Sequence, residues 1–248
     1  MHTYFSCRNI FGAFMIFVFL LTITGCCPES DYPCNRVKVD PPERAKTYLA
    51  LSDSLKLKRE TTLQKLSKME DKELYERLQK ESLAGRESFN SLAFKEFVQR
   101  DKKSTEALYN YMIADNRTSF LGILALRKMD STLYKRLESS FVLSNLVKTL
   151  EQSESFNSWG LPHLYWEDAA KILIEKGTSA ISYLKPLLKN TKPAPVWGSE
   201  ESMEYKKYQY RICDYAMALI LEIKGEKLPI PVEIEKRDKI IQSLINDK

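Results

Sequence analysis

Side chains that could do acid–base chemistry occur in this 248-residue sequence as two adjacent carboxylate pairs and one nearby histidine. The pairs are Glu167-Asp168 and Glu200-Glu201, and the histidine is His163. General acid–base catalysis needs two groups that converge on one substrate, whereas consecutive residues on a helix point in different directions. A lone histidine in a loop is more often a surface or packing residue. Because no nucleophile motif or glycine-rich phosphate loop is present, we expect a protein without enzymatic activity.

Aromatic side chains form the second group that could do chemistry, because aromatic rings can bind a partner segment or a sugar face. All three tryptophans lie in two stretches, SWGLPHLYWED (158–168) and the segment 191–210. If a helical hairpin over 166–190 brings its ends together, the two stretches meet. The predicted binding residues are Trp159, His163, Tyr165, Trp166, Trp197, Glu200, Glu201, Tyr208, Tyr210 and Arg211. The alternative interpretation is that these aromatic residues cap the core of the domain.

Near the amino terminus, the segment Ile10 to Ile23 carries no charge. A helix rises about 1.5 Å per residue, so this segment is too short for the ~30 Å hydrocarbon core of a bilayer. It has the length of a signal-peptide apolar region, and the small residues Thr24 and Gly25 follow it.

The four residues Ile23-Thr24-Gly25-Cys26 resemble the lipobox of bacterial lipoproteins. The resemblance implies that residues 1–25 are a signal peptide, that cleavage follows Gly25, and that Cys26 is thioether-linked to diacylglycerol. The membrane is then reached through the lipid, in a bacterial cell envelope. Residue 27 is Cys rather than Asp, which by resemblance to lipoprotein sorting favours the outer membrane, on its periplasmic or surface face. The alternative is an uncleaved anchor helix with an incidental cysteine.

The remaining cysteines have open roles. Cys27 and Cys34 bracket the turn-rich PESDYP, where they could close a small disulfide in an oxidising compartment or stay free thiols in a tether. Residues 26–42 are proline-rich without periodicity, so we interpret them as that tether. Cys213 has the surroundings of a small buried apolar residue. No cofactor is expected, and no metal site, because the spacings typical of metal ligands do not occur.

Charge limits the class of partner. The chain has 38 Lys and Arg against 33 Asp and Glu, a net charge of +5, and the two signs alternate along it. Mixed charge of this kind is typical of solvated helix faces and excludes a nucleic-acid partner. The mean hydropathy of −0.36 is that of a soluble fold held by its lipid.

The pattern from residue 43 to 248 predicts one all-α domain. Leu63, Leu66, Leu74 and Leu78 follow helical spacing, the whole chain has only 8 glycines, and no alternating strand-like run stands out.

Internal repetition is clearest at 166–190 and 211–229. DAAKILIEKGTSAISYLKPLLKN (168–190) resembles a HEAT-like or armadillo-type repeat, and DYAMALILEIKGEKLP (214–229) repeats its first half. The resemblance implies an α-solenoid of helical hairpins, irregular towards the N-terminal half. Ala170 is expected to be buried. Two departures are Pro186 inside the second helix, which should kink it, and an inserted loop at 191–210.

These observations favour an interaction scaffold: a lipid-anchored α-solenoid that binds another envelope protein, since solenoids mostly present extended binding surfaces. Insertions often map to the binding face, so we expect Trp197 to be partly exposed. The alternative is a glycan- or small-ligand-binding lipoprotein that uses Trp159, Trp166 and Trp197.

Overall fold

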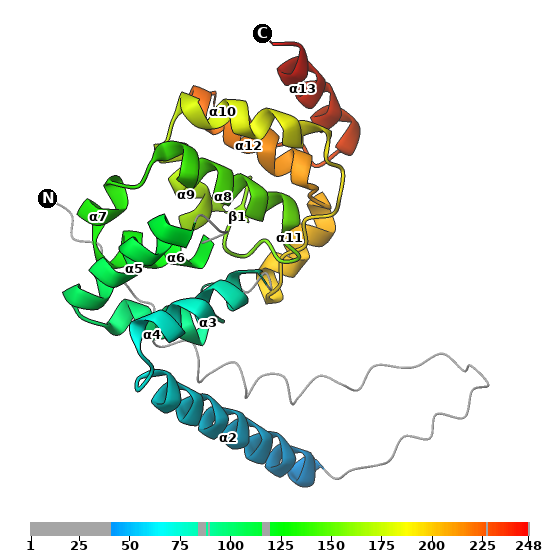
Figure 1. Ribbon diagram of the computed structural model, residues 1–248. Coiled ribbons are helices and arrows are strands. Elements are labelled where there is room, and N and C mark those ends of the chain that lie inside the picture. The colour runs from blue at the N-terminus through cyan, green and yellow to red at the C-terminus, as the bar shows by residue number, and fades with distance from the viewer. Residues whose placement is uncertain (1–40, 84–87, 89, 116–119, 227, 248) are drawn as a thin grey trace, which may run out of the picture. The chain divides into compact units, whose positions relative to one another are not determined.

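The computed structural model describes residues 41–83, 88, 90–115, 120–226 and 228–247 (Figure 1). The predicted signal peptide, Cys26 and the pair Cys27 and Cys34 lie outside the described residues. The chain divides into two compact units, residues 1–51 and 52–248. Of the first unit the structure describes 41–51, which are the beginning of helix α2 (Pro41–Leu66). The predicted tether, 26–42, therefore overlaps α2 at Pro41 and Pro42, which are helical. Proline is tolerated at this position because the first N–H groups of a helix have no partner within the helix.

The predicted all-α fold class is confirmed, since the described part of the chain is mainly helical with one two-stranded sheet. After α2, the elements up to residue 152 are α3 (Asp71–Leu83), α4 (Leu92–Gln99), α5 (Lys102–Asp115), α6 (Phe120–Met129), α7 (Ser131–Lys135) and α8 (Ser139–Gln152). The later elements are β1 (Gly160–Leu161), β2 (Tyr165–Trp166), α9 (Asp168–Glu175), α10 (Thr178–Leu184), the 3-10 helix η1 (Lys185–Lys189), α11 (Ser199–Tyr208), α12 (Ile212–Lys224) and α13 (Ile234–Asn246).

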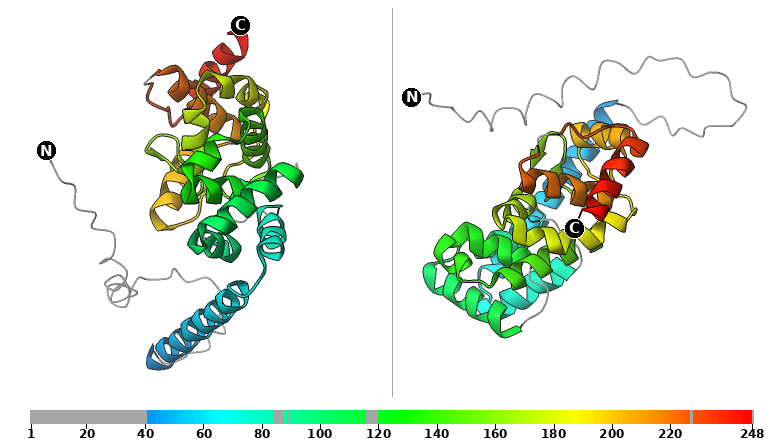
Figure 2. Two further views of the ribbon diagram at one scale, coloured as in Figure 1. Left: turned by 60° about the vertical axis from the view of Figure 1, so that its left-hand side comes forward. Right: turned by 90° about the horizontal axis from the view of Figure 1, so that it is seen from above.

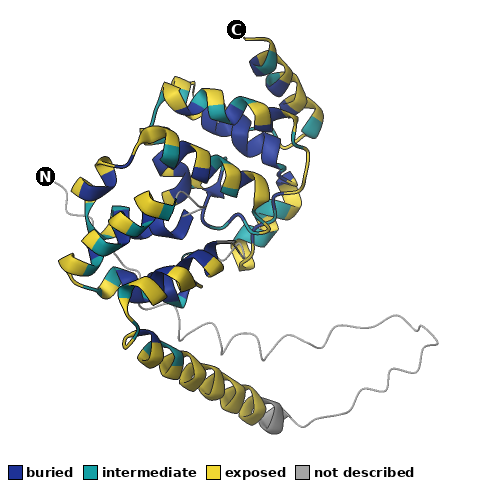
Figure 3. Cartoon of the chain, viewed as in Figure 1, coloured by how far each residue is buried: buried dark blue, intermediate teal, exposed yellow. Residues whose placement is uncertain are grey.

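Two apolar helices form the centre of the second unit. Every residue from Phe120 to Leu126 of α6 is buried, and α3, α4, α5, α7 and α8 pack around it. Every residue from Ile212 to Leu221 of α12 is buried as well, against α9, α10, η1 and α13. A helix that is apolar on all sides must be covered on all sides, and Figure 3 shows buried residues gathered where these helices face their neighbours.

The segment 166–190, predicted to be a helical hairpin, contains α9 followed by α10 and η1, but α9 packs mainly against α8 and α12 and less against α10. Gly177 separates α9 from α10 with a φ of +62°, a backbone conformation that favours glycine. Ala170 has no exposed surface, as predicted, because α9 packs closely against α8 and α12. Figure 2 shows α9, α10 and η1 from two further sides, with α10 beside α12.

The predicted kink at Pro186 takes the form of a change in helix type. The α-helix ends at Leu184 and a 3-10 helix continues over 185–189. Proline lacks the N–H that an α-helical turn would use, and its ring crowds the preceding turn. The helix therefore continues as a tighter 3-10 helix instead of ending there. Leu187 and Leu188 remain buried.

The prediction of a loop over all of 191–210 is wrong, because residues 199–208 form α11. Glu200 and Glu201 lie in the first turn of this helix and Lys206 and Lys207 in its last turn, which suits the helix dipole. Only the part before α11 is extended, and it pairs with the segments around it. Phe156 N–H donates to Pro195 O at 2.9 Å, and Ala194 N–H donates to Tyr210 O at 2.8 Å.

Candidate functional site

A short β-hairpin, residues 160–166, is the element on which the candidate site is built. Gly160 pairs with Trp166 and Leu161 with Tyr165 in antiparallel register. Gly160 has a φ of +88°, and a Cβ there would lie 2.4 Å from Tyr165 O, so no other residue fits without a shift. Its carbonyl accepts a hydrogen bond from the Tyr215 hydroxyl at 2.8 Å. The hairpin is therefore fixed to the buried helix α12.

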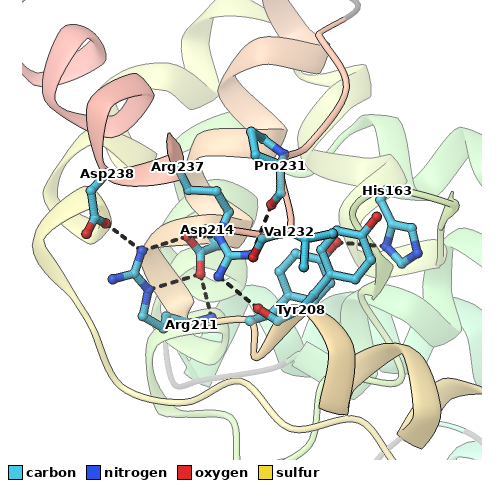
Figure 4. A network of polar contacts seen from close by, with 9 residues as sticks. His163, Tyr208, Arg211, Asp214, Pro231, Val232, Arg237 and Asp238 are labelled. Atoms are coloured by element: carbon cyan, nitrogen blue, oxygen red, sulfur yellow. Dashed lines mark hydrogen bonds and ion pairs between the residues drawn. The ribbon is translucent and has the colours of Figure 1, made fainter. Parts of the chain in front are cut away.

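His163, at the turn of the hairpin, joins it to α11. Its Nε2 lies 2.9 Å from Glu204 Oε2. Its Nδ1 lies 2.7 Å from the Tyr210 hydroxyl, a contact that the dashed line at His163 in Figure 4 marks. The imidazole stacks on Tyr208 with ring centroids 4.1 Å apart. A neutral imidazole with its proton on Nε2 satisfies both contacts, since Nε2–H donates to the carboxylate and the Tyr210 hydroxyl donates to Nδ1.

Burial lowers the pKa of His163, and Glu204 opposes that effect. Tyr210 has no exposed surface, and burial raises the pKa of its hydroxyl. The Tyr210 oxygen is thus a protonated, enclosed group and not a nucleophile that a substrate could reach. The contacts that link Glu204, His163 and Tyr210 hold the β-hairpin in place.

A buried ionic network lies on the other side of Tyr208. Asp214 and Arg237 are both fully buried, and Arg237 Nε lies 3.1 Å from Asp214 Oδ1 as an ion pair without hydrogen-bond geometry. Asp214 also accepts hydrogen bonds from the backbone N–H and guanidinium of Arg211. The hydrogen bond to Asp214 raises the pKa of Arg211, whose guanidinium also donates to Asp238 at 2.6 Å.

Arg237 connects this network to three backbone carbonyls, as Figure 4 shows. Its Nη1 donates to Pro231 O and Val232 O at 3.1 Å each, and its Nη2 donates to Tyr208 O at 2.8 Å. The network joins α13 to the end of α11 and to the start of α12. Asp214 lies in the first turn of α12, where its carboxylate accepts from the Arg211 N–H and pairs with the guanidinium groups of Arg211 and Arg237.

The sequence does not single out Arg237, which looks like one more charge in IEKRDKII. The signal that reveals it is helical spacing: Arg237 shares a face with the buried Ile241 and Leu244. Glu204 is also outside the predicted site. Glu204 lies four residues before Tyr208, a spacing that places both side chains on one face of a helix. This spacing indicates the site only once the segment is known to be helical.

The three tryptophans do not form one surface. Trp159 is 1% exposed and stacks on Phe120 with ring centroids 6.0 Å apart, so the prediction that it binds a partner or a sugar is wrong. Trp166 is half-buried against Tyr215. Trp197 is 64% exposed, which confirms the prediction of partial exposure. Among the other predicted residues, Tyr208 and Tyr210 are buried and Arg211 is half-buried in the ionic network.

Four large apolar side chains remain exposed on the hairpin and on the segment hydrogen-bonded to it, and we refer to them together as the hairpin face: Leu164, Tyr165, Trp197 and Met203. Hydrogen bonds join the two segments that carry these residues at two places. Trp197 N–H donates to Asn157 Oδ1 at 2.9 Å, and Asn157 Nδ2 donates to Trp197 O at 2.5 Å. The bond between His163 and Glu204 joins the same segments further along.

Acidic side chains border this face. Glu200 is exposed and Glu201 half-buried on α11. Burial raises the pKa of Tyr165, and the charges of Glu201 and Glu167 add to the effect. Of the predicted residues, Tyr165, Trp197 and Glu200 are exposed and Glu201 is half-buried, all on the two joined segments.

Cys213 is a buried free thiol, and burial raises its pKa to about 11, so it stays protonated and unreactive. Within the described ranges, no group of three or more His, Cys, Asp or Glu side chains could hold a metal ion. None of the helices in the described part of the chain is long and apolar enough to cross a membrane.

Comparison of the chain with protein-family models, with curated proteins and with solved structures finds no match. Function is therefore inferred from the site and from the sequence.

Proposed function

We propose that this chain is a lipid-anchored protein of a bacterial cell envelope and acts as a non-enzymatic scaffold that binds another envelope protein. The anchor is argued from the apolar segment 10–23 and from the lipobox-like residues 23–26. Two or more acyl chains would hold a folded domain at a membrane without a spanning segment.

The scaffold is an irregular α-solenoid in this proposal. The helices α8, α9, α10, α12 and α13 follow one another along the chain, with η1 directly after α10. Contacts connect α8 to α9 and α10, then α9, α10 and η1 to α12, and α12 to α13. Stacking of successive helical hairpins is how HEAT-like proteins build a continuous core.

The observation that carries the interaction role is the hairpin face. Its four side chains stay exposed although hydrogen bonds hold the segments that bear them: Tyr215 to Gly160 O, Asn157 to Trp197, and His163 to Glu204. An apolar group that is exposed on a rigid support loses little conformational entropy when a partner covers it. Aromatic and Met side chains are also the types enriched at interfaces.

The polar groups near this face favour binding over catalysis. Both ring nitrogens of His163 have partners, and Asp214 is enclosed by two arginines. Catalysis needs groups that can exchange protons with a substrate. The glycan-binding alternative needs exposed aromatic rings on which a sugar can stack, and Trp159 is buried in the core.

Site-specific crosslinking in native membranes tests the scaffold proposal. A photoreactive phenylalanine analogue replaces Trp197 in the full chain, and the matched control carries it at Ile113, an exposed apolar residue of α5. We expect a discrete protein adduct from position 197 that is missing from position 113. Equal adducts from both positions, or none from position 197, would contradict the scaffold.

The anchor is tested separately by Cys26→Ala. We expect this variant to accumulate as a precursor that keeps residues 1–25 and carries no lipid, with Cys7→Ala as the control that is processed normally. An unmodified Cys26 in the mature wild-type chain, seen by mass spectrometry, would remove the anchor from the proposal and leave the scaffold untouched.

A further inference from the structure

A groove of about 400 Å³ lies between the hairpin and α12, and it continues along the chain that connects α12 to α13. Pro162, His163 and Trp166 line it from the hairpin. This volume is within the roughly 300–1,000 Å³ typical of ligand sites. The groove is distinct from the hairpin face, none of whose four residues lines it.

Most of the residues that line the groove are apolar. Among them, Leu221 of α12 is almost fully buried and Trp166 is half-buried. Leu228 lines the groove as well and is 51% exposed. An apolar side chain placed here would be covered from several sides, and water would leave these surfaces.

Two acidic residues, Glu222 and Glu226, line the groove where α12 ends, a part that we call its acidic end, and both are exposed. The helix dipole adds to the negative charge at this C-terminal end of α12. Gly225, between the two glutamates, has a φ of +74°, a backbone conformation that favours glycine.

Lys224 attracts Glu226 electrostatically, but its ammonium group is ion-paired with Asp247. Neither Glu222 nor Glu226 belongs to an ion pair with another described residue. No Lys or Arg is among the described lining residues. A ligand that brings its own positive charge would complement this end.

We propose that this groove binds an extended segment of a partner protein in which Lys or Arg stands next to apolar residues. The apolar side chain lies over Leu221 against Trp166, and the basic side chain reaches Glu222 and Glu226. Because its walls are exposed and it runs along two different segments of the chain, the groove suits an extended chain. This second binding surface does not depend on the hairpin face.

Selection of peptides on the purified full-length chain tests the proposal. A displayed library of random peptides is selected against the wild type, and enriched peptides are measured by fluorescence polarisation. We expect enrichment of Lys or Arg beside Leu, Ile, Val or Pro. Affinity should fall about tenfold or more for the double variant Glu222→Lys/Glu226→Lys and less for Glu222→Gln/Glu226→Gln. Added salt should weaken binding, because the acidic end is exposed.

Two controls test whether the peptides bind in this groove. Trp197→Ala alters the hairpin face only, so it should leave peptide affinity within about twofold of wild type. The double variants change exposed side chains, so their melting temperatures should match wild type. The proposal is overturned if no peptide is enriched, if enriched peptides lack basic residues, or if the charge-reversed variant binds them as wild type does. Loss of binding in Trp197→Ala would place the peptides on the hairpin face instead.

Discussion

The segments 156–166 and 195–210 carry two sets of large side chains with opposite surroundings. On the inner side, Trp159 and Tyr210 are enclosed, the first by Phe120 and the second by His163 and Tyr215. On the outer side, Trp197 and Met203 are 64% and 70% exposed. Two residues of the same type, Trp159 and Trp197, therefore have different roles on these joined segments. The inner set of side chains stabilises the backbone, and the outer set stays exposed on it.

The difference shows how an interaction surface can be kept rigid in a small helical domain. The region contains little regular structure apart from α11 and the two-residue strands, so ordinary helix packing does not hold it. Hydrogen bonds from buried groups do so instead, through Tyr215, His163 and Arg237. Variants of the inner side should therefore change stability, and variants of the outer side should change binding.

The largest effect is expected for Asp214→Ala. This variant leaves Arg237 buried without its carboxylate, which costs about 3–5 kcal/mol. It also removes the side chain that accepts from the Arg211 N–H, worth roughly another 1 kcal/mol. Asp238→Ala is the matched control, because Asp238 also pairs with Arg211 but is exposed, and its loss should cost about 1 kcal/mol or less. Urea unfolding measures both, and equal losses would show that the buried network is not the main support.

Trp159→Ala should lower the free energy of unfolding by about 3–5 kcal/mol, because it opens a cavity beside Phe120. Trp197→Ala should cost under about 1 kcal/mol, as for surface positions in general. Thermal melts of the two variants compare the inner and outer sides directly. A large loss for Trp197→Ala would mean that its ring supports the fold.

Gly160→Ala should cost about 1–3 kcal/mol, because the residue has a positive φ and its Cβ would meet Tyr165 O. Gly177→Ala is the matched control: it also has a positive φ, but a Cβ there meets nothing within 4 Å. Its cost should be smaller, on the order of 1 kcal/mol. If the two variants melt alike, the close approach of the hairpin strands contributes nothing.

A smaller effect should appear in the pH dependence of stability. The pKa of His163 is lowered in the folded chain, so the unfolded chain binds the proton more tightly. The stability that neutral His163 contributes is complete above its unfolded pKa of ~6.5 and is lost as pH falls below that value. Wild type should therefore lose more stability than His163→Gln between pH ~7 and ~5.5. Parallel losses in the two proteins would show that the Glu204–His163–Tyr210 contacts do not favour the neutral ring.

Helical periodicity is enough to predict the fold class and the presence of helices α9 and α10. Ala170, Gly177 and Pro186 each have one physical requirement, close packing, a positive φ and a missing N–H, that can be read without the rest of the chain. The helix α11 is not evident beforehand because PAPVWG precedes it and its own apolar residues are few.

The site is less predictable because burial in an irregular segment depends on distant partners. Trp159 and Trp197 look alike in the sequence, yet Trp159 meets Phe120 from α6 and Trp197 is left at the surface. Arg237 is the opposite case, a charged residue buried because Asp214, 23 positions earlier, lies within 3.1 Å of it. Neither pairing follows from local spacing.

The most direct measurement of the central claim is the yield of the membrane crosslink from position Leu164 when the rest of the hairpin face is truncated. The photoreactive analogue at Leu164 is combined with Trp197→Ala and Met203→Ala, and the control combines it with Ile113→Ala. We expect the adduct to fall at least about tenfold in the first chain, because interface aromatic residues are often worth ~2 kcal/mol or more, and to persist in the second. Both chains should melt within a few degrees of wild type. An undiminished adduct in the truncated chain would contradict the proposal that the hairpin face binds the partner.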